Sequence, residues 1–143
     1  MKVKGLDKLI KDLHKLGAVG VQAIADVTEF TARDIERDAK ILAPVNKRDT
    51  GGDLRQGIQH QEIDRFHYRV VAHQKYSAYQ EFGTGGLVEV PQELYDIAIQ
   101  FKGKGIRQVN IPPRAFLYPA FVKGRNQYYN DLKDELDRLT NDI

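Results

Sequence analysis

IQHQEIDRFHYRVVA, residues 58–72, decides the fold class of this 143-residue chain. Its second half alternates between apolar and polar positions, the period-two pattern of a half-buried strand. Residues 58–63 form a suitable partner strand, and Asp64 and Arg65 supply the turn between the two. We therefore expect an antiparallel β-hairpin at the centre of the sequence. The alternating residues are Phe66, Tyr68, Val70 and Ala72 on one face and His67, Arg69, Val71 and His73 on the other.

Helical periodicity precedes this hairpin. Apolar residues between Leu6 and Leu16 recur at helical spacing, and residues 21–42 repeat the pattern, so we expect two helices with Gly17 and Gly20 as the interruption. Pro44 should stop the second helix, because the residue before a proline is driven out of the helical region. The expected inward stripe of the second helix is Ile24, Thr28, Thr31, Ile35, Ala39 and Leu42.

Helical periodicity returns after the hairpin. Residues 76–82 predict a short helix that Gly83 stops, and residues 91–101 predict another. A long amphipathic helix follows from Leu117, with Pro119 tolerated in its first turn. The sequence therefore predicts one α+β domain over residues 1–143, in which an antiparallel hairpin or small sheet packs against long amphipathic helices. Residues 87–110 form a longer inserted segment with a short helix and a basic loop. The expected stripe of the last helix is Leu117, Phe121, Tyr128, Leu132, Leu136, Leu139 and Ile143.

Composition narrows the function classes. Apolar residues make up 41% and charged residues 29% of the chain, as in folded globular proteins. The 22 basic and 20 acidic residues leave a formal charge of +2, so any contact with nucleic acid would need a local patch. The absence of cysteine excludes disulfides and thiolate chemistry. No apolar run approaches the ~18 residues that span a bilayer, and the lysine-rich start lacks the apolar core of a signal peptide, so we expect a protein that stays in the cytosol of the cell that makes it.

Candidate catalytic and metal-binding residues are sparse. The four histidines, His14, His60, His67 and His73, form no recognised metal pattern, and solvent-facing strand histidines are the favoured interpretation. Glu81 lies between aromatic residues without a second carboxylate or base, which favours a buried or interface ion pair over a catalytic acid. The glycine-rich stretches at 83–86 and 103–105 match neither a P-loop nor a dinucleotide fingerprint and are typical of turns. The sequence predicts no enzymatic activity and no cofactor.

A basic cluster next to Phe101 is the candidate DNA-facing surface. Positive charge beside an aromatic ring is a recurring way to hold nucleic acid. The alternative, and the favoured interpretation, is a loop that charge keeps soluble, because Glu89, Glu93 and Asp96 lie close in sequence and dilute the field. The same loop is also suited to line a channel through which DNA passes. The cluster consists of Lys102, Lys104, Arg107 and Arg114.

Three stretches are distinctive: PVNKRDTGGDLRQGI (44–58), with proline and glycines, and YSAYQEFGT (76–84) and IPPRAFLYPAF (111–121), in which aromatic residues stand beside glycine or proline. In this order they resemble the HK97 gp10-like family of tailed-bacteriophage neck and tail-completion proteins, over roughly half of the chain. Gly52 is one glycine more than the family's threonine-glycine-x-leucine-arginine segment, Arg114-Ala115 replaces its arginine-proline, and residues 87–110 are longer than in many members. The residues that carry the resemblance, and are candidates for an interface, are Thr50, Gly51, Leu54, Tyr76, Tyr79, Glu81, Phe82, Gly83, Thr84, Phe116, Leu117 and Pro119; Pro44, Arg55 and Ala120 also match.

The resemblance implies a structural protein of the virion, made in the bacterial host cytoplasm and located at the head–tail junction or the upper end of the tail. It implies a ring of identical copies around the DNA passage, in contact with neighbouring neck or tail proteins and without a membrane partner. Tyr76, Tyr79, Phe82 and Phe116 are suited either to anchor such an interface or to fill the core of a single copy. A small nucleic-acid-binding module that uses residues 102–114 is the alternative, and a hydrolase built on the histidines of the hairpin is a distant third.

Overall fold

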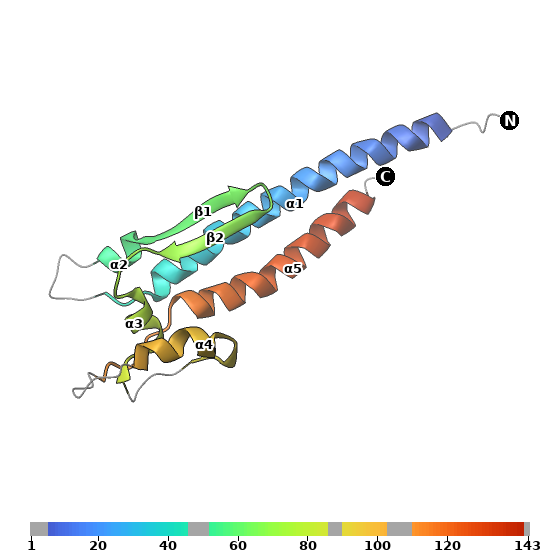
Figure 1. Cartoon of the computed structure of the whole chain (residues 1–143). Coiled ribbons are helices and arrows are strands. Elements are labelled where there is room, and N and C mark those ends of the chain that lie inside the picture. Colours follow the sequence, from blue (N-terminus) through green and yellow to red (C-terminus); the bar gives the residue numbers. More distant parts are fainter. Residues whose placement is uncertain (1–5, 46–51, 86–89, 103–109, 142–143) are drawn as a thin grey trace.

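The computed structural model describes residues 6–45, 52–85, 90–102 and 110–141 (Figure 1). Its main elements are a long helix α1 (Leu6–Leu42), strands β1 (Ile58–Asp64) and β2 (His67–Ala72), and a second long helix α5 (Leu117–Asn141). Short helices connect them: α2 (Asp53–Gln56), α3 (Ser77–Phe82), η2 (Gln92–Leu94), α4 (Tyr95–Ala98) and η3 (Ile99–Lys102). The predicted α+β class, with a two-stranded antiparallel sheet and long helices, is confirmed.

Helix α1 is continuous over 37 residues, so the prediction of an interruption at Gly17 and Gly20 was wrong. A single glycine costs a helix only about 1 kcal/mol relative to alanine. The apolar residues before and after these glycines recur in one helical phase, as a single uninterrupted helix requires. The helix ends at Leu42, two residues before Pro44, as predicted.

The hairpin has the predicted strands. Ile58 pairs with Ala72, His60 with Val70 and Gln61 with Arg69, and the register becomes irregular between Glu62 and Asp64 at the turn. Phe66 was predicted to belong to the alternating strand. It does not, because β2 begins at His67. Its ring lies at the turn and is 49% exposed.

Helix α1 is the central element of the fold, because both α5 and the hairpin pack against it (Figure 1). The hairpin covers only the C-terminal part of α1, and its turn reaches Gln22, whose side-chain oxygen accepts a hydrogen bond from Arg65. Beyond this point α1 and α5 continue side by side as a pair of helices. We call this pair, residues 6–21 of α1 and 129–141 of α5, the two-helix arm.

The core lies at the other end, where α1, α2, β1 and the start of α5 meet. Phe116 and Ile58 are its largest fully buried side chains. The expected stripe of α1 ended at Leu42, but Leu42 is 49% exposed and Ala43 is buried in its place. Ala43 lies one helical turn beyond Ala39, so both face α5 and α2, whereas Leu42 is turned to the side. The buried cluster consists of Ile35, Ala39, Ala43, Leu54, Ile58, Phe116 and Ala120.

Glu36 joins α1 to the hairpin. Its carboxylate accepts a hydrogen bond from the backbone N–H of His60 at 2.9 Å and also contacts His60 Nδ1 and Lys40 Nζ. Partial burial acts to raise the pKa of Glu36, but the hydrogen bonds from Lys40 and His60 outweigh it and lower the pKa to about 2. The folded state therefore prefers the ionised carboxylate more strongly than the unfolded state does.

We expect Glu36→Gln to lower the free energy of unfolding by about 1–2 kcal/mol at neutral pH. This is less than the full pKa shift would give, because solvent screens the interaction between Glu36 and Lys40. Because the pKa of Glu36 is depressed in the folded state, its contribution is present above pH 4.5 and is lost as the pH falls towards 2. Urea denaturation of both proteins at several pH values measures the difference. A difference that stays constant down to pH 2 would contradict this assignment.

Candidate functional site

The last two of the three motif stretches are joined by backbone hydrogen bonds at the core end of the molecule. The N–H of Arg114 donates to the carbonyl of Gln80 at 2.7 Å. The N–H of Thr84 donates to the carbonyl of Ile111, and the N–H of Ile111 donates to the hydroxyl oxygen of Thr84, each at 3.0 Å. Segments 80–84 and 111–114, which are distant in sequence, therefore form one unit.

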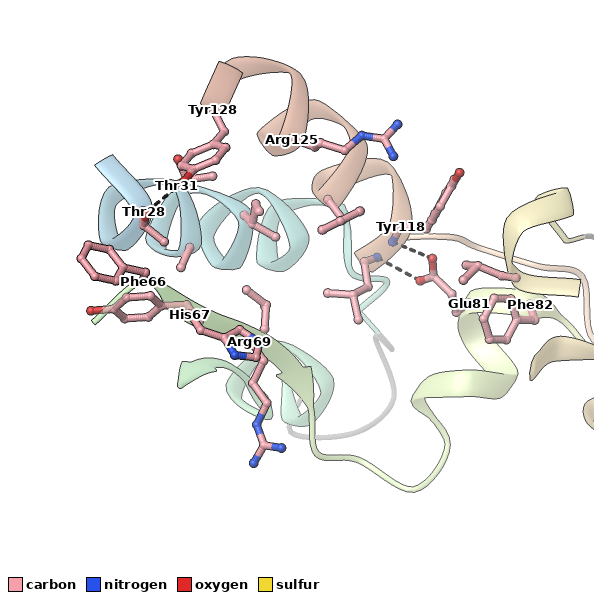
Figure 2. Close-up of a pocket in the computed structure, with 17 residues that line it drawn as sticks. Thr28, Thr31, Phe66, His67, Arg69, Glu81, Phe82, Tyr118, Arg125 and Tyr128 are labelled. Atoms are coloured by element: carbon pink, nitrogen blue, oxygen red, sulfur yellow. Dashed lines mark hydrogen bonds between the residues drawn. The ribbon is translucent and has the colours of Figure 1, made fainter. Parts of the chain in front are cut away.

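Glu81 caps the N-terminus of α5. Its Oε2 accepts hydrogen bonds from the backbone N–H groups of Phe116 at 2.8 Å and Leu117 at 2.9 Å, and its Oε1 accepts one from Tyr118 at 2.8 Å (Figure 2). The next residue, Pro119, has no N–H. A helix leaves about four N-terminal N–H groups without intrahelical partners. Here Glu81 satisfies three of them and proline removes the fourth.

This arrangement corrects the prediction of an ion pair for Glu81. The carboxylate is buried, with 7% of the residue exposed, and its described partners are backbone amides. Amide dipoles at a helix N-terminus stabilise a negative charge and so take the place of a cation. The sequence could not show this partner, because Glu81 and Tyr118 lie 37 residues apart.

Other motif residues also hold the backbone in place. The Nε of Arg55 donates to the carbonyl of Ala43 at 3.2 Å, just beyond the C-terminus of α1. Gly52, the glycine that is additional to the family motif, precedes α2 with φ of 136°, a conformation that residues with a side chain rarely adopt. Gly83 ends α3 with φ of 74°, which confirms the predicted stop.

The four motif aromatics divide into two pairs. Phe82 and Phe116 are buried, with 9% and 1% exposed, and fill the interior of this copy. Tyr76 and Tyr79 are 42% and 43% exposed and border a surface cleft of about 540 Å³. We call this the tyrosine cleft. Residues from all three motif stretches line it: Pro44, Val45, Gly52, Asp53, Leu54, Tyr76, Tyr79, Gln80, Ile111 and Arg114.

A larger groove of about 630 Å³ opens between β2 and α5, with α1 as its floor (Figure 2). The ring of Phe66 is exposed on the hairpin side, and Phe121, 46% exposed, lies on the α5 side. The hydroxyl groups of Tyr128 and Thr28 are hydrogen-bonded at 3.1 Å, which joins α5 to the floor. Side chains from the hairpin and from α5 thus form opposite walls of an open and mainly apolar groove. Sequence reasoning missed this groove. It placed Phe121 and Leu136 in the inward stripe of α5, but the two residues are 46% and 51% exposed.

The remaining predicted residues are only partly placed. Thr50, Gly51, Lys104 and Arg107, and the side chain of Lys102, lie outside the described part of the chain, so of the basic cluster the structure places only Arg114, which is exposed. His60 contacts Glu36, and the ring of His73 is within hydrogen-bonding distance of the Gln61 amide. Over the described residues, no three or more of His, Cys, Asp and Glu come together as a group that could hold a metal ion.

The chain matches the family model described as "Bacteriophage HK97-gp10, putative tail-component" over residues 7–83, more than half of its length. The chain belongs to this family. The matched region of this HK97-gp10-like protein runs from α1 through the hairpin to Gly83 and so includes Glu81, whereas the helix that Glu81 caps lies beyond it. Comparison with curated proteins and with solved structures gives no match. Within the described ranges, no helix has the length and apolar character needed to cross a membrane.

The family description assigns this protein to the bacteriophage tail and therefore to the virion.

Proposed function

We propose that this tail component assembles into a cyclic homo-oligomer around the DNA passage, at the head–tail junction or the upper end of the tail, and acts by assembly without catalysis. The observation that carries the proposal is the unusually large surface of the single chain. Its accessible area is 10840 Å². A compact monomer of 16.3 kDa would expose about 7,500 Å².

The excess of about 3,300 Å² is ample for association with neighbouring copies, because a typical stable interface covers about 800 Å² on each partner. A ring requires two different surfaces on every copy, each matched to the other. The chain offers two separate surfaces, the tyrosine cleft, whose lining is both polar and apolar, and the mainly apolar groove between β2 and α5. The cleft exposes tyrosine and the groove exposes phenylalanine, and aromatic residues are favoured anchors of protein interfaces.

Native mass spectrometry of the purified protein over a range of concentrations tests the proposal. We expect one closed oligomer larger than a dimer, and a central hole when it is imaged by negative-stain electron microscopy. A protein that stays monomeric at every concentration, alone and with neighbouring tail proteins, would contradict the ring.

The double variant Tyr76→Ser/Tyr79→Ser should weaken assembly at least about tenfold, because two exposed anchors are lost, each of which typically contributes more than about 1 kcal/mol. Tyr95→Ser is the matched control, since Tyr95 is 50% exposed but lies outside the tyrosine cleft. Circular dichroism checks that both variants keep the fold. Equal assembly of both variants would exclude the tyrosine cleft from the interface.

A further inference from the structure

The groove between β2 and α5 combines an apolar interior with a positively charged edge on α5. Arg125 lies on this edge, with its guanidinium 5.9 Å from the centre of the Phe121 ring, whereas Arg69 extends from β2 on the side away from α5 (Figure 2). Arg69 donates to the side-chain oxygen of Gln61 at 2.8 Å. Among the described residues, neither arginine forms an ion pair with a carboxylate. Glu81, the one acid in the described lining, is already bound by three amides.

The α5 half of the two-helix arm carries the complementary features. Tyr129 and Leu136 are 65% and 51% exposed. They lie seven residues apart on one side of α5, with the partly buried Leu132 between them, and so form an apolar stripe. Residues 131–141 contain four acidic and two basic residues, a net charge of −2, whereas residues 117–130 contain two basic residues and no acidic one, a net charge of +2.

We propose that the groove of one copy binds the two-helix arm of a second copy, with the stripe of Tyr129 and Leu136 packed between the hairpin and α5. This inference rests on the proposed ring and names one contact between neighbouring copies, in addition to the contact proposed for the tyrosine cleft. A chain cannot fill its own groove with its arm, because α1 and α5 are continuous helices that carry the arm away from the hairpin (Figure 1).

Charge and area both favour a second copy as the occupant. The acidic end of α5 in the second copy approaches a groove edged by Arg125, so opposite charges meet. In a head-to-tail ring, one neighbour would cover the groove of each copy and the other neighbour would cover its arm. At about 800 Å² for each face, the two together need about 1,600 Å², roughly half of the excess surface.

Disulfide cross-linking provides a direct test, because the chain has no cysteine of its own. Phe66→Cys marks the groove, and Leu136→Cys marks the arm; both side chains are about half exposed. The two single-cysteine proteins are mixed under mild oxidation and compared with a mixture of Phe66→Cys and Asn126→Cys. Asn126 is the matched control, since it is exposed on α5 but lies outside the groove lining.

We expect the groove–arm heterodimer to form at least about tenfold faster than the control heterodimer and to slow as salt is raised, because screening weakens the charge contact. A chain that carries both Phe66→Cys and Leu136→Cys should then give a ladder of covalent oligomers. Cross-linking no faster than the control, or a ladder that stops at the dimer, would overturn the head-to-tail contact.

The result separates this inference from the proposed ring. If native mass spectrometry shows a closed oligomer while the groove–arm pair cross-links no faster than the control, the ring stands and the contact is wrong. If the protein is monomeric and the pair does not cross-link, both are wrong.

Discussion

Glu81→Ala is expected to lower the free energy of unfolding by about 2–4 kcal/mol, because it leaves the N-terminal amides of α5 without their acceptor. Three backbone N–H groups, those of Phe116, Leu117 and Tyr118, lose their partner at once, and Phe116 is almost completely buried. Domains are typically stable by only about 5–15 kcal/mol, so the loss is a large fraction of the total. Urea denaturation followed by circular dichroism measures it.

Two controls make the prediction specific to the cap. Glu81→Gln keeps one side-chain oxygen as an acceptor but removes the negative charge, so its effect should lie between those of the wild type and Glu81→Ala. Glu135→Ala removes a carboxylate whose partner, Arg138, lies one turn away on the same helix, and should cost much less than Glu81→Ala. A Glu81→Ala protein as stable as the Glu135→Ala protein would exclude the capping role.

The same cap bears on function. Glu81 lies in α3, beside the tyrosine cleft, and its carboxylate holds the start of α5, which forms one wall of the groove. Loss of the cap should therefore disturb both proposed interaction surfaces together. This gives Glu81 a structural role that is independent of any catalytic chemistry.

Gly124→Leu is expected to lower the free energy of unfolding by about 3 kcal/mol, the upper part of the usual range for overpacking. Gly124 is buried where α5 crosses α1, and a Cβ atom at this position would lie 2.2 Å from Cγ1 and 2.7 Å from Cδ1 of Ile35. Contacts this short force one helix or the Ile35 side chain to move. Because Ile35 belongs to the buried cluster, it has little room to do so. Thermal denaturation measures the loss.

Gly17→Leu is the matched control, because a Cβ atom at Gly17 meets nothing within 4 Å. There the higher helix propensity of leucine should leave stability unchanged or raise it by about 0.5–1 kcal/mol. The clash itself is tested by a double-mutant cycle with Gly124→Ala and Ile35→Ala. Removing the Ile35 side chain should make Gly124→Ala less harmful than it is alone. Additive effects of the two substitutions would show that Ile35 is not the obstacle.

The local sequence pattern predicted those structural features correctly that depend on residues close together in the sequence. The alternation in residues 58–72 correctly predicted the hairpin, the helical spacing from Leu117 predicted α5, and Pro44 and Gly83 ended their helices as expected. The prediction of a break at Gly17 and Gly20 was wrong, because each glycine costs a helix only about 1 kcal/mol relative to alanine and does not by itself end it. The motif spacing also suggested the family, and the match of residues 7–83 to the family model confirmed it.

The sequence by itself therefore determined the α+β class, most of the element boundaries and the phage family. Only the tertiary structure decided what the motif residues do. It placed the carboxylate of Glu81 on amides more than thirty residues away, buried Phe82 and Phe116 while leaving Tyr76 and Tyr79 at the surface, and opened the groove between β2 and α5. The physical reason is that caps, burial and grooves depend on distances between elements that are far apart in the chain, and periodicity within one element carries no information about those distances.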